Sequence, residues 1–176
     1  MTLTQVRPDG IESLPSGSIL QVQYTQYETA TSMSNSANTD TAIDELAVNI
    51  TPKFNNSIIK LDGYLAHEHS NINFTGNAMA FFFRGTTKLS IAAASSRRVG
   101  IAVPLLGYHQ NAGSTLDGVN LTWFDNAHST TSQVTYKIGF STLYSGTLHI
   151  NKTVTDTDNN EHERGASFIS ATEIKA

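Results

Sequence analysis

The chain contains no cysteine, so it forms no disulfide bond and has no thiolate chemistry. A small scaffold held together by disulfides is therefore excluded, and the fold must rest on a hydrophobic core. A chain of 176 residues can bury such a core as one domain. Only 15% of the residues are charged, but aromatic residues reach 9% and occur along the whole chain, which indicates a folded domain.

Long apolar runs and concentrated positive charge are also missing. No run approaches the roughly 20 residues that a membrane-spanning helix needs, and residues 1–7 lack the apolar segment of a secretory signal peptide. Arg97 and Arg98 are the one adjacent basic pair in a chain of net charge −4, whereas nucleic-acid binders present a basic stripe. We therefore expect neither membrane insertion nor a nucleic-acid partner.

From Ser18 onward, apolar and polar residues alternate in short segments, which is the pattern of half-buried β-strands. The segments are 20–24, 46–50, 59–65, 78–83, 99–103, 119–123, 134–140 and 148–150, with a closing strand near the C-terminus. No segment has a convincing helical period. The sequence therefore predicts an all-β fold of eight or nine strands, an antiparallel two-sheet sandwich with a jelly-roll-like arrangement.

Three segments depart from this alternation. Residues 42–46 and 91–94 are the two candidates for a short helical turn. Residues 29–41 are rich in Ser, Thr and Asn and predict a long polar loop.

The first 17 residues differ from the rest, because two turn signals, at Pro8-Asp9-Gly10 and Pro15-Ser16-Gly17, frame isolated apolar residues. We interpret residues 1–17 as an extended N-terminal anchoring arm and residues 18–176 as the β-sandwich head domain. A loosely ordered terminus is the alternative. In the arm hypothesis the anchoring side chains are Leu3, Val6, Ile11 and Leu14.

Two places carry metal-ligand types of residue. His67 and His69 share a face if they lie in a strand, so both imidazoles could bind one metal ion with a third ligand from elsewhere. Asp156 and Asp158 place oxygens at alternate positions, as calcium loops do, but the later glycine and bidentate glutamate are absent. We favour ordinary hydrogen bonds for the histidines and a solvated turn for the aspartates. We therefore predict no metal and no cofactor.

Some residues suit contacts between chains. In residues 78–83 the side chains on both faces of the predicted strand are apolar, so we expect this strand to be covered on both faces. On the outward parity, Phe82 and Phe124 would leave apolar surface on a lone sandwich, and a closed symmetric oligomer would bury it. Glu161, Glu163 and Arg164 are expected either to form a local ion pair or to contact a neighbouring chain.

Motifs for enzymatic chemistry are absent: the chain has neither a Gly-x-Ser-x-Gly nucleophile motif nor a phosphate-binding loop. We expect a protein that is not an enzyme, with a small polysaccharide depolymerase as a remote alternative. Aromatic residues could form a sugar-binding platform, although packing in the core or between subunits is the favoured interpretation. The residues considered for this platform are Tyr24, Tyr27, Tyr64, Tyr108, Trp123 and Phe124.

In the order of its sequence motifs the chain resembles a family of small virion structural proteins of aquatic tailed phages. The resemblance is carried, in this order, by residues 1–11, 17–24 and 48–52, the Phe-Phe-Phe-Arg strand and Gly-Thr-Thr-Lys-Leu hairpin at 81–89, residues 132–139, the turn from Asp156 to Asp158, Arg164-Gly165 and Glu173-Ile174. Each motif alone is a common strand or turn pattern, and the resemblance rests on their order over nearly the whole chain.

The resemblance implies a component of the outer surface of a virion, such as a head fibre, a capsid decoration protein or a tail fibre head. It also implies a homotrimer, and an arm that docks on a capsid or tail protein. Because the first strand follows Gly10 within about ten residues, a decoration protein is favoured over a long fibre shaft. The alternative is a receptor- or carbohydrate-binding tail fibre module whose partner is a host-surface glycan. The family supplies no catalytic residue.

Overall fold

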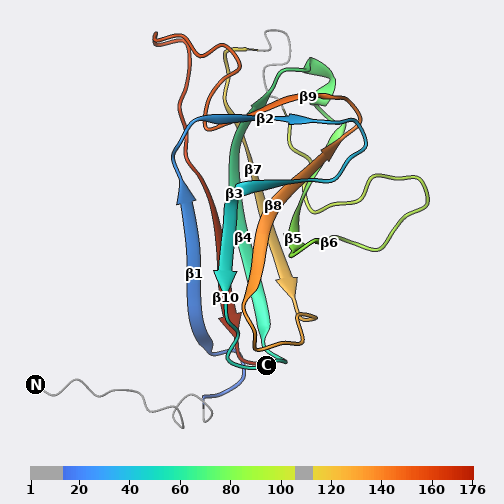
Figure 1. The fold of residues 1–176 in the computed structure, drawn as a ribbon, viewed down its shortest axis with the longest axis vertical. Coiled ribbons are helices and arrows are strands. Elements are labelled where there is room, and N and C mark those ends of the chain that lie inside the picture. The colour runs from blue at the N-terminus through green and yellow to red at the C-terminus, as the bar shows by residue number, and fades with distance from the viewer. Residues whose placement is uncertain (1–13, 106–112) are drawn as a thin grey trace, which may run out of the picture.

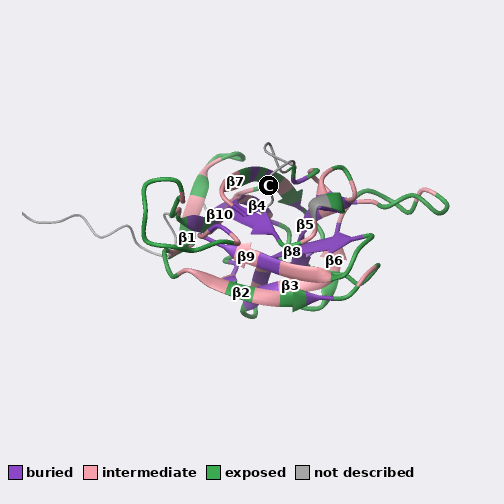
Figure 2. Ribbon diagram, turned by 90° about the horizontal axis from the view of Figure 1, so that it is seen from above, coloured by how far each residue is buried: buried purple, intermediate pink, exposed green. Residues whose placement is uncertain are grey.

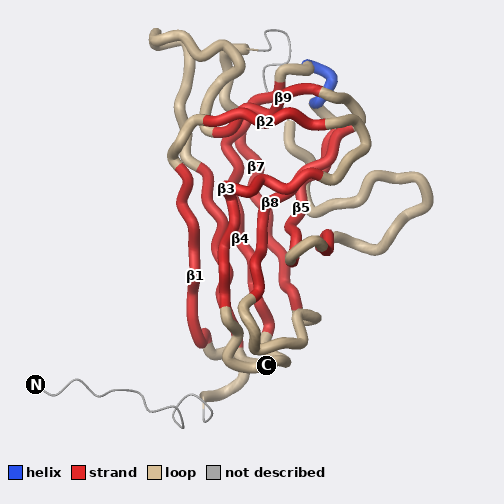
Figure 3. The backbone as a smooth tube through the Cα atoms, viewed as in Figure 1, coloured by secondary structure: helices blue, strands red, loops and turns tan. Residues whose placement is uncertain are grey.

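A computed structural model describes residues 14–105 and 113–176 of the chain. Among these residues it contains ten strands and one short 3₁₀ turn (Figure 1; Figure 3). The strands are β1 (Ile19–Tyr27), β2 (Thr31–Asn35), β3 (Thr41–Ile50), β4 (Ile58–His69), β5 (Ala78–Arg84), β6 (Thr87–Leu89), β7 (Asp117–Asp125), β8 (Val134–Thr142), β9 (Gly146–Ile150) and β10 (Ser167–Ile174), and the turn η1 is Ile72–Phe74. Of the predicted anchors, Leu3, Val6 and Ile11 lie outside the described residues, and Leu14 is half-buried.

The strands form two antiparallel sheets, which confirms the predicted sandwich. The large sheet has the order β1-β10-β4-β9-β2, with β7 on the other side of β4, and the small sheet has the order β3-β8-β5-β6. β2 and β9 form an additional pair at one edge of the large sheet. When the other eight strands are renumbered 1 to 8 along the chain, their order is 1-8-3-6 in the large sheet and 2-7-4-5 in the small sheet. This is the double Greek-key order of a jelly roll.

The core lies between the two sheets, where Figure 2 shows the buried segments. Alternate residues of β4, such as Ile59, Leu61 and Leu65, point inward and meet Tyr136 and Ile138 of β8. The predicted alternation in these strands is therefore confirmed. Burial of such side chains, each worth roughly 1.5–3 kcal/mol, is the main force that holds the sheets together.

β5 is covered on both faces, as expected, but Phe82 has the opposite role from the predicted one. Its side chain is fully buried in the core, beside Gly63 of β4, so it is not an inter-subunit residue. Phe81 and Phe83 point to the other side of the small sheet and are also buried. There they pack edge to face on each other, and Lys88 lies over the Phe81 ring at 3.9 Å.

Other segments differ from the sequence-based expectations. The polar residues 29–41 include the strand β2, and the expected strand at 99–103 is a loop that touches β5 through a single bridge between Ala102 and Ala80. Residues 42–46 belong to β3, where a register shift against β8 interrupts the alternation. Residues 91–94 lie in a loop that extends away from the sandwich (Figure 1). Within the described ranges no helix has the length and apolarity to cross a membrane.

The large sheet divides along β4, the longest strand. On one side β4 pairs with β7 from Ile59 to His67, while on the other it pairs first with β10 and then, from His67, with β9. Asn151 fills the junction, because its side chain donates to the Tyr27 carbonyl at 2.7 Å and accepts from the Ser167 hydroxyl at 2.7 Å. The split places two histidines at the upper end of β4 and leaves a flat four-stranded face below it.

Candidate functional site

The two predicted histidines lie side by side at the end of β4 and point into the core. His67 and His69 are both fully buried, and both contact the ring of Phe74 in η1. His69 Nε2 lies 2.8 Å from Asn35 Oδ1, and the Asn71 N–H donates to His69 Nδ1 at 3.0 Å. Both ring nitrogens of His67 are buried without a hydrogen-bond partner.

Burial determines the protonation of this histidine pair. Loss of hydration, together with the smaller effect of the charge of His69, lowers the pKa of His67 to about 4. Burial also lowers the pKa of His69 to about 4. Both rings are therefore neutral near pH 7, and His69 is assigned a proton on Nε2 by its bonds to Asn35 and Asn71.

A third metal ligand does not accompany the pair. In residues 14–105 and 113–176, no three His, Cys, Asp or Glu side chains gather where they could hold one ion. Glu68 lies between the two histidines in the sequence. Its carboxylate accepts a hydrogen bond from the Val154 N–H in the loop that follows β9. His69 makes the ordinary hydrogen bonds that the sequence favoured, whereas His67 packs against Phe74 and makes none through its ring nitrogens.

Asp156 and Asp158 line a small open pocket in the loop between β9 and β10, with Asn159, His162 and Arg164. Arg164 pairs with Asp156 at 2.7 Å, and Lys152 lies 3.8 Å from the same carboxylate. Arg164 therefore has a local ion pair, but with Asp156 and not with the glutamates considered from the sequence. Glu163 accepts a hydrogen bond from the Leu116 N–H at 2.9 Å, so it too has a partner within the chain.

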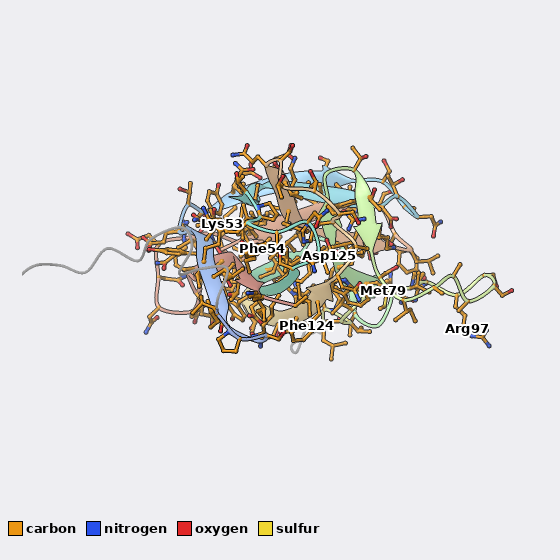
Figure 4. All side chains as sticks on the ribbon, turned by 90° about the horizontal axis from the view of Figure 1, so that it is seen from below. Lys53, Phe54, Met79, Arg97, Phe124 and Asp125 are labelled. Carbon is orange, nitrogen blue, oxygen red and sulfur yellow. The ribbon has the colours of Figure 1, made fainter. Side chains whose placement is uncertain are left out.

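Ser57, His128 and Glu173 form a buried cluster at the lower end of the sandwich. Ser57 Oγ donates to Glu173 Oε1 at 2.7 Å and lies 3.4 Å from His128 Nε2. The residue types are those of a hydrolase triad, but the carboxylate contacts the serine instead of orienting the histidine. Glu173 also accepts from the backbone of Lys53 and Phe54. The cluster thus holds the β3–β4 loop against the last strand (Figure 4 labels both loop residues).

A second buried polar cluster closes the side of the sandwich. Arg84 pairs with Asp125 at 2.8 Å, and the Tyr136 hydroxyl donates to the same carboxylate at 2.8 Å. Burial, together with the neighbouring Asp125 carboxylate, raises the pKa of Tyr136. Neither cluster was found from the sequence, because Ser57, Asp125 and Glu173 lie far apart in the chain.

The outer face of the large sheet has a different character. We use the name "outer face" for the outward residues of β1, β10, β4 and β7, which pair in four rows. The rows are Ile19–Ile174–Ile58, Val22–Thr172–Lys60–Phe124, Tyr24–Ser170–Asp62–Thr122 and Gln26–Phe168–Tyr64–Asn120. Each row contains at least one large apolar or aromatic side chain.

Three of the six aromatic residues considered for a platform lie on the outer face: Tyr24, Tyr64 and Phe124. Phe124 points outward while its neighbour Asp125 points inward (Figure 4). Tyr27 and Trp123 pack against the core instead, and Tyr108 lies outside the described residues. The outer face also includes Phe168, which the sequence reasoning missed although its parity opposes that of Ile169 and Ala171.

The fold defines the chain as a jelly-roll β-sandwich. No protein-family model matches it, and a search of curated proteins finds no match. Among solved structures it is similar to the VP2 subviral particle of infectious bursal disease virus, at 12% identity and a TM-score of 0.42, over 88% of this chain and 41% of that one. It is also similar to infectious bursal disease virus Gx strain, at 15% identity and a TM-score of 0.37, over 90% and 37%. The chain thus spans about two fifths of the length of these proteins.

Proposed function

We propose that this chain is a structural protein of a virion, which assembles as a homotrimer on the outer surface and docks through its N-terminal arm on a capsid or tail protein. The sequence resemblance over nearly the whole chain supports this proposal. The jelly-roll topology agrees with it, since viral capsid domains are among the proteins that use this fold. Because one fold serves many functions, the residues must carry the argument further.

The observation that carries the proposal is the use of the buried polar groups. Ser57 and Glu173 are both sealed in the interior, and their polar atoms bond loop backbone and each other. Asp125 is likewise 3% exposed and joins the two sheets through Arg84. Groups able to perform chemistry thus stabilise the scaffold, which agrees with a structural role.

The test is removal of residues 1–15, which precede β1. The truncated chain should keep its circular dichroism spectrum and melting temperature but should no longer join particles in a reconstitution assay. A density map of the intact particle would give the position and copy number of the chain. Incorporation of the truncated chain at the level of the full chain would contradict the anchoring function.

A second candidate function is a carbohydrate-binding module. Tyr24 and Tyr64 on the outer face alternate with the polar residues Gln26 and Asn120, and aromatic rings beside amide groups suit a sugar. A glycan array probed with the full chain, and with the Tyr24→Ser variant as control, distinguishes this function from assembly alone.

A further inference from the structure

We propose that the outer face is the surface through which copies of this chain contact one another. The inference rests on the proposed assembly into an oligomer and assigns it to β1, β10, β4 and β7. A second copy of the chain is the occupant to which the observations point, and apolar exposure, charge and size each support this assignment.

Large apolar side chains are exposed at both margins of the outer face and in β10. At its β1 margin Ile19, Val22 and Tyr24 are 64%, 51% and 74% exposed. In β10 Phe168 is 39% exposed, and at the β7 margin Phe124 is 56% exposed. Several large apolar side chains exposed on one face of a domain indicate an interaction site, and the aromatic residues are the types enriched in interface cores.

The charges on the outer face are already compensated within the chain. Lys60 Nζ lies 2.8 Å from Asp62 Oδ2, and Thr122 donates to the other Asp62 oxygen at 2.8 Å. A neighbouring copy can therefore cover this face without burying an unpaired charge. A strongly charged partner would find no complementary charge here.

The small sheet lacks a comparable surface. Its aromatic residues Phe81 and Phe83 are buried by the chain itself. Lys137–Asp44 is an exposed ion pair at 2.7 Å on the same sheet. The outer face carries one ion pair, Lys60–Asp62, whereas the small sheet carries two, Lys137–Asp44 and Lys88–Asp40, so contact through the small sheet would desolvate more charge.

The outer face is large enough for a specific contact. At normal sheet spacings four strands extend roughly 14 Å across and four rows extend roughly 20 Å along the strands. With the reach of the side chains, the face offers on the order of 500 Å² per copy. This approaches the roughly 800 Å² per partner that stable interfaces bury, so packing of this face can supply most of an interface.

The test compares two double variants of the full chain by size-exclusion chromatography with light scattering at micromolar concentration. Tyr24→Asp/Phe124→Asp alters both margins of the outer face. Ile91→Asp/Val103→Asp is the matched control, because these residues are 59% and 45% exposed in the segment that follows β6. All four side chains are exposed, so both variants should fold, which circular dichroism and melting temperature verify.

We expect the wild-type chain and the control to run as oligomers of the 19.1 kDa chain. The face variant should run as a monomer, with its dissociation constant raised roughly 100-fold or more by two charged groups in a buried interface. An oligomeric face variant would overturn the inference and leave the proposed function standing.

The remaining outcomes separate the inference from the proposed function. A monomeric wild-type chain that still joins particles would overturn the inference and the homotrimer, and would leave the virion function standing. A wild-type oligomer that the face variant disrupts, but that does not join particles, would support the inference and contradict the virion function. A monomeric wild-type chain that binds immobilised host polysaccharide, with binding lost in the face variant, would overturn the inference in favour of a sugar-binding surface.

Discussion

Arg84 at the end of β5 and Asp125 at the end of β7 join the two sheets through one contact: the Arg84 Nη1 atom lies 2.8 Å and 3.0 Å from the two oxygens of the Asp125 carboxylate. The Asp125 side chain is 3% exposed, and it also accepts bonds from the Tyr136 hydroxyl and the Ala127 N–H. This carboxylate therefore satisfies donors from three different parts of the sandwich. Its removal affects the connection between the sheets rather than one loop.

We expect Asp125→Ala to lower the free energy of unfolding by about 3 kcal/mol, because it leaves a guanidinium and a buried hydroxyl without a partner. Urea denaturation followed by Trp123 fluorescence measures the change. The exposed pair Lys137–Asp44 is the control, and Asp44→Ala should change stability by less than about 1 kcal/mol. Equal losses in both variants would show that the Asp125 contact has no special role.

Much of the fold follows from the sequence because a period of two is a local property. In β8 and β10 every second residue is buried on one side, so Tyr136, Ile138 and Ile169 could be assigned from parity alone. Parity does not decide which face is inward where both are apolar. Phe82 was assigned to the surface for this reason, whereas Phe81 and Phe83 occupy the outer side under cover of the chain itself.

Elements that depend on distant partners could not be predicted. β2 has the polar sequence of a loop and forms a strand because β9 pairs with it. Conversely, residues 99–103 alternate like a strand, but they contact β5 through the backbone of Ala80 alone, in an isolated bridge at Ala102. The outer face was found in part, through Tyr24, Tyr64 and Phe124. Its rows depend on the register in which four strands pair, and the sequence alone does not determine that register.

Acid should destabilise the fold through His67 and His69. Their pKa is about 4 in the folded chain and 6.5 when exposed, so the unfolded chain binds more protons between these values. Stability is therefore full above about pH 6.5 and falls as the pH decreases towards about 4, by on the order of 2 kcal/mol per histidine near pH 5. Urea unfolding between pH 7 and about pH 4.5 measures this loss.

The His67→Phe variant tests the assignment, because it keeps an aromatic side chain beside Phe74 and removes one titrating group. Its stability should depend less steeply on pH than that of the wild type. A slope unchanged by the loss of His67 would contradict the prediction, and imidazole resonances in NMR titrations report the two pKa values directly.

Asn151 combines a backbone requirement with a side-chain requirement at the point where the large sheet divides. Its φ is 60°, in the left-handed region, and its side chain bonds Tyr27 and Ser167. Asn151→Gly keeps the conformation and loses the bonds, whereas Asn151→Ala loses both. We expect the alanine variant to be less stable than the glycine variant by about 1 kcal/mol in thermal or urea unfolding. The reverse order would show that backbone conformation at this position has little weight.

Two glycines that neighbour aromatic rings should respond differently to alanine. A Cβ at Gly139 would lie 2.4 Å from the buried Phe83 ring, and a Cβ at Gly118 would lie within 2.2 Å of the Tyr64 hydroxyl on the outer face. Because Phe83 is enclosed, Gly139→Ala should lower the free energy of unfolding by about 1–3 kcal/mol. The half-buried Tyr64 can swing into solvent, so Gly118→Ala should cost less than about 1 kcal/mol. Calorimetry of both variants tests this difference, and a larger loss at Gly118 would mean that Tyr64 is held in place on the outer face.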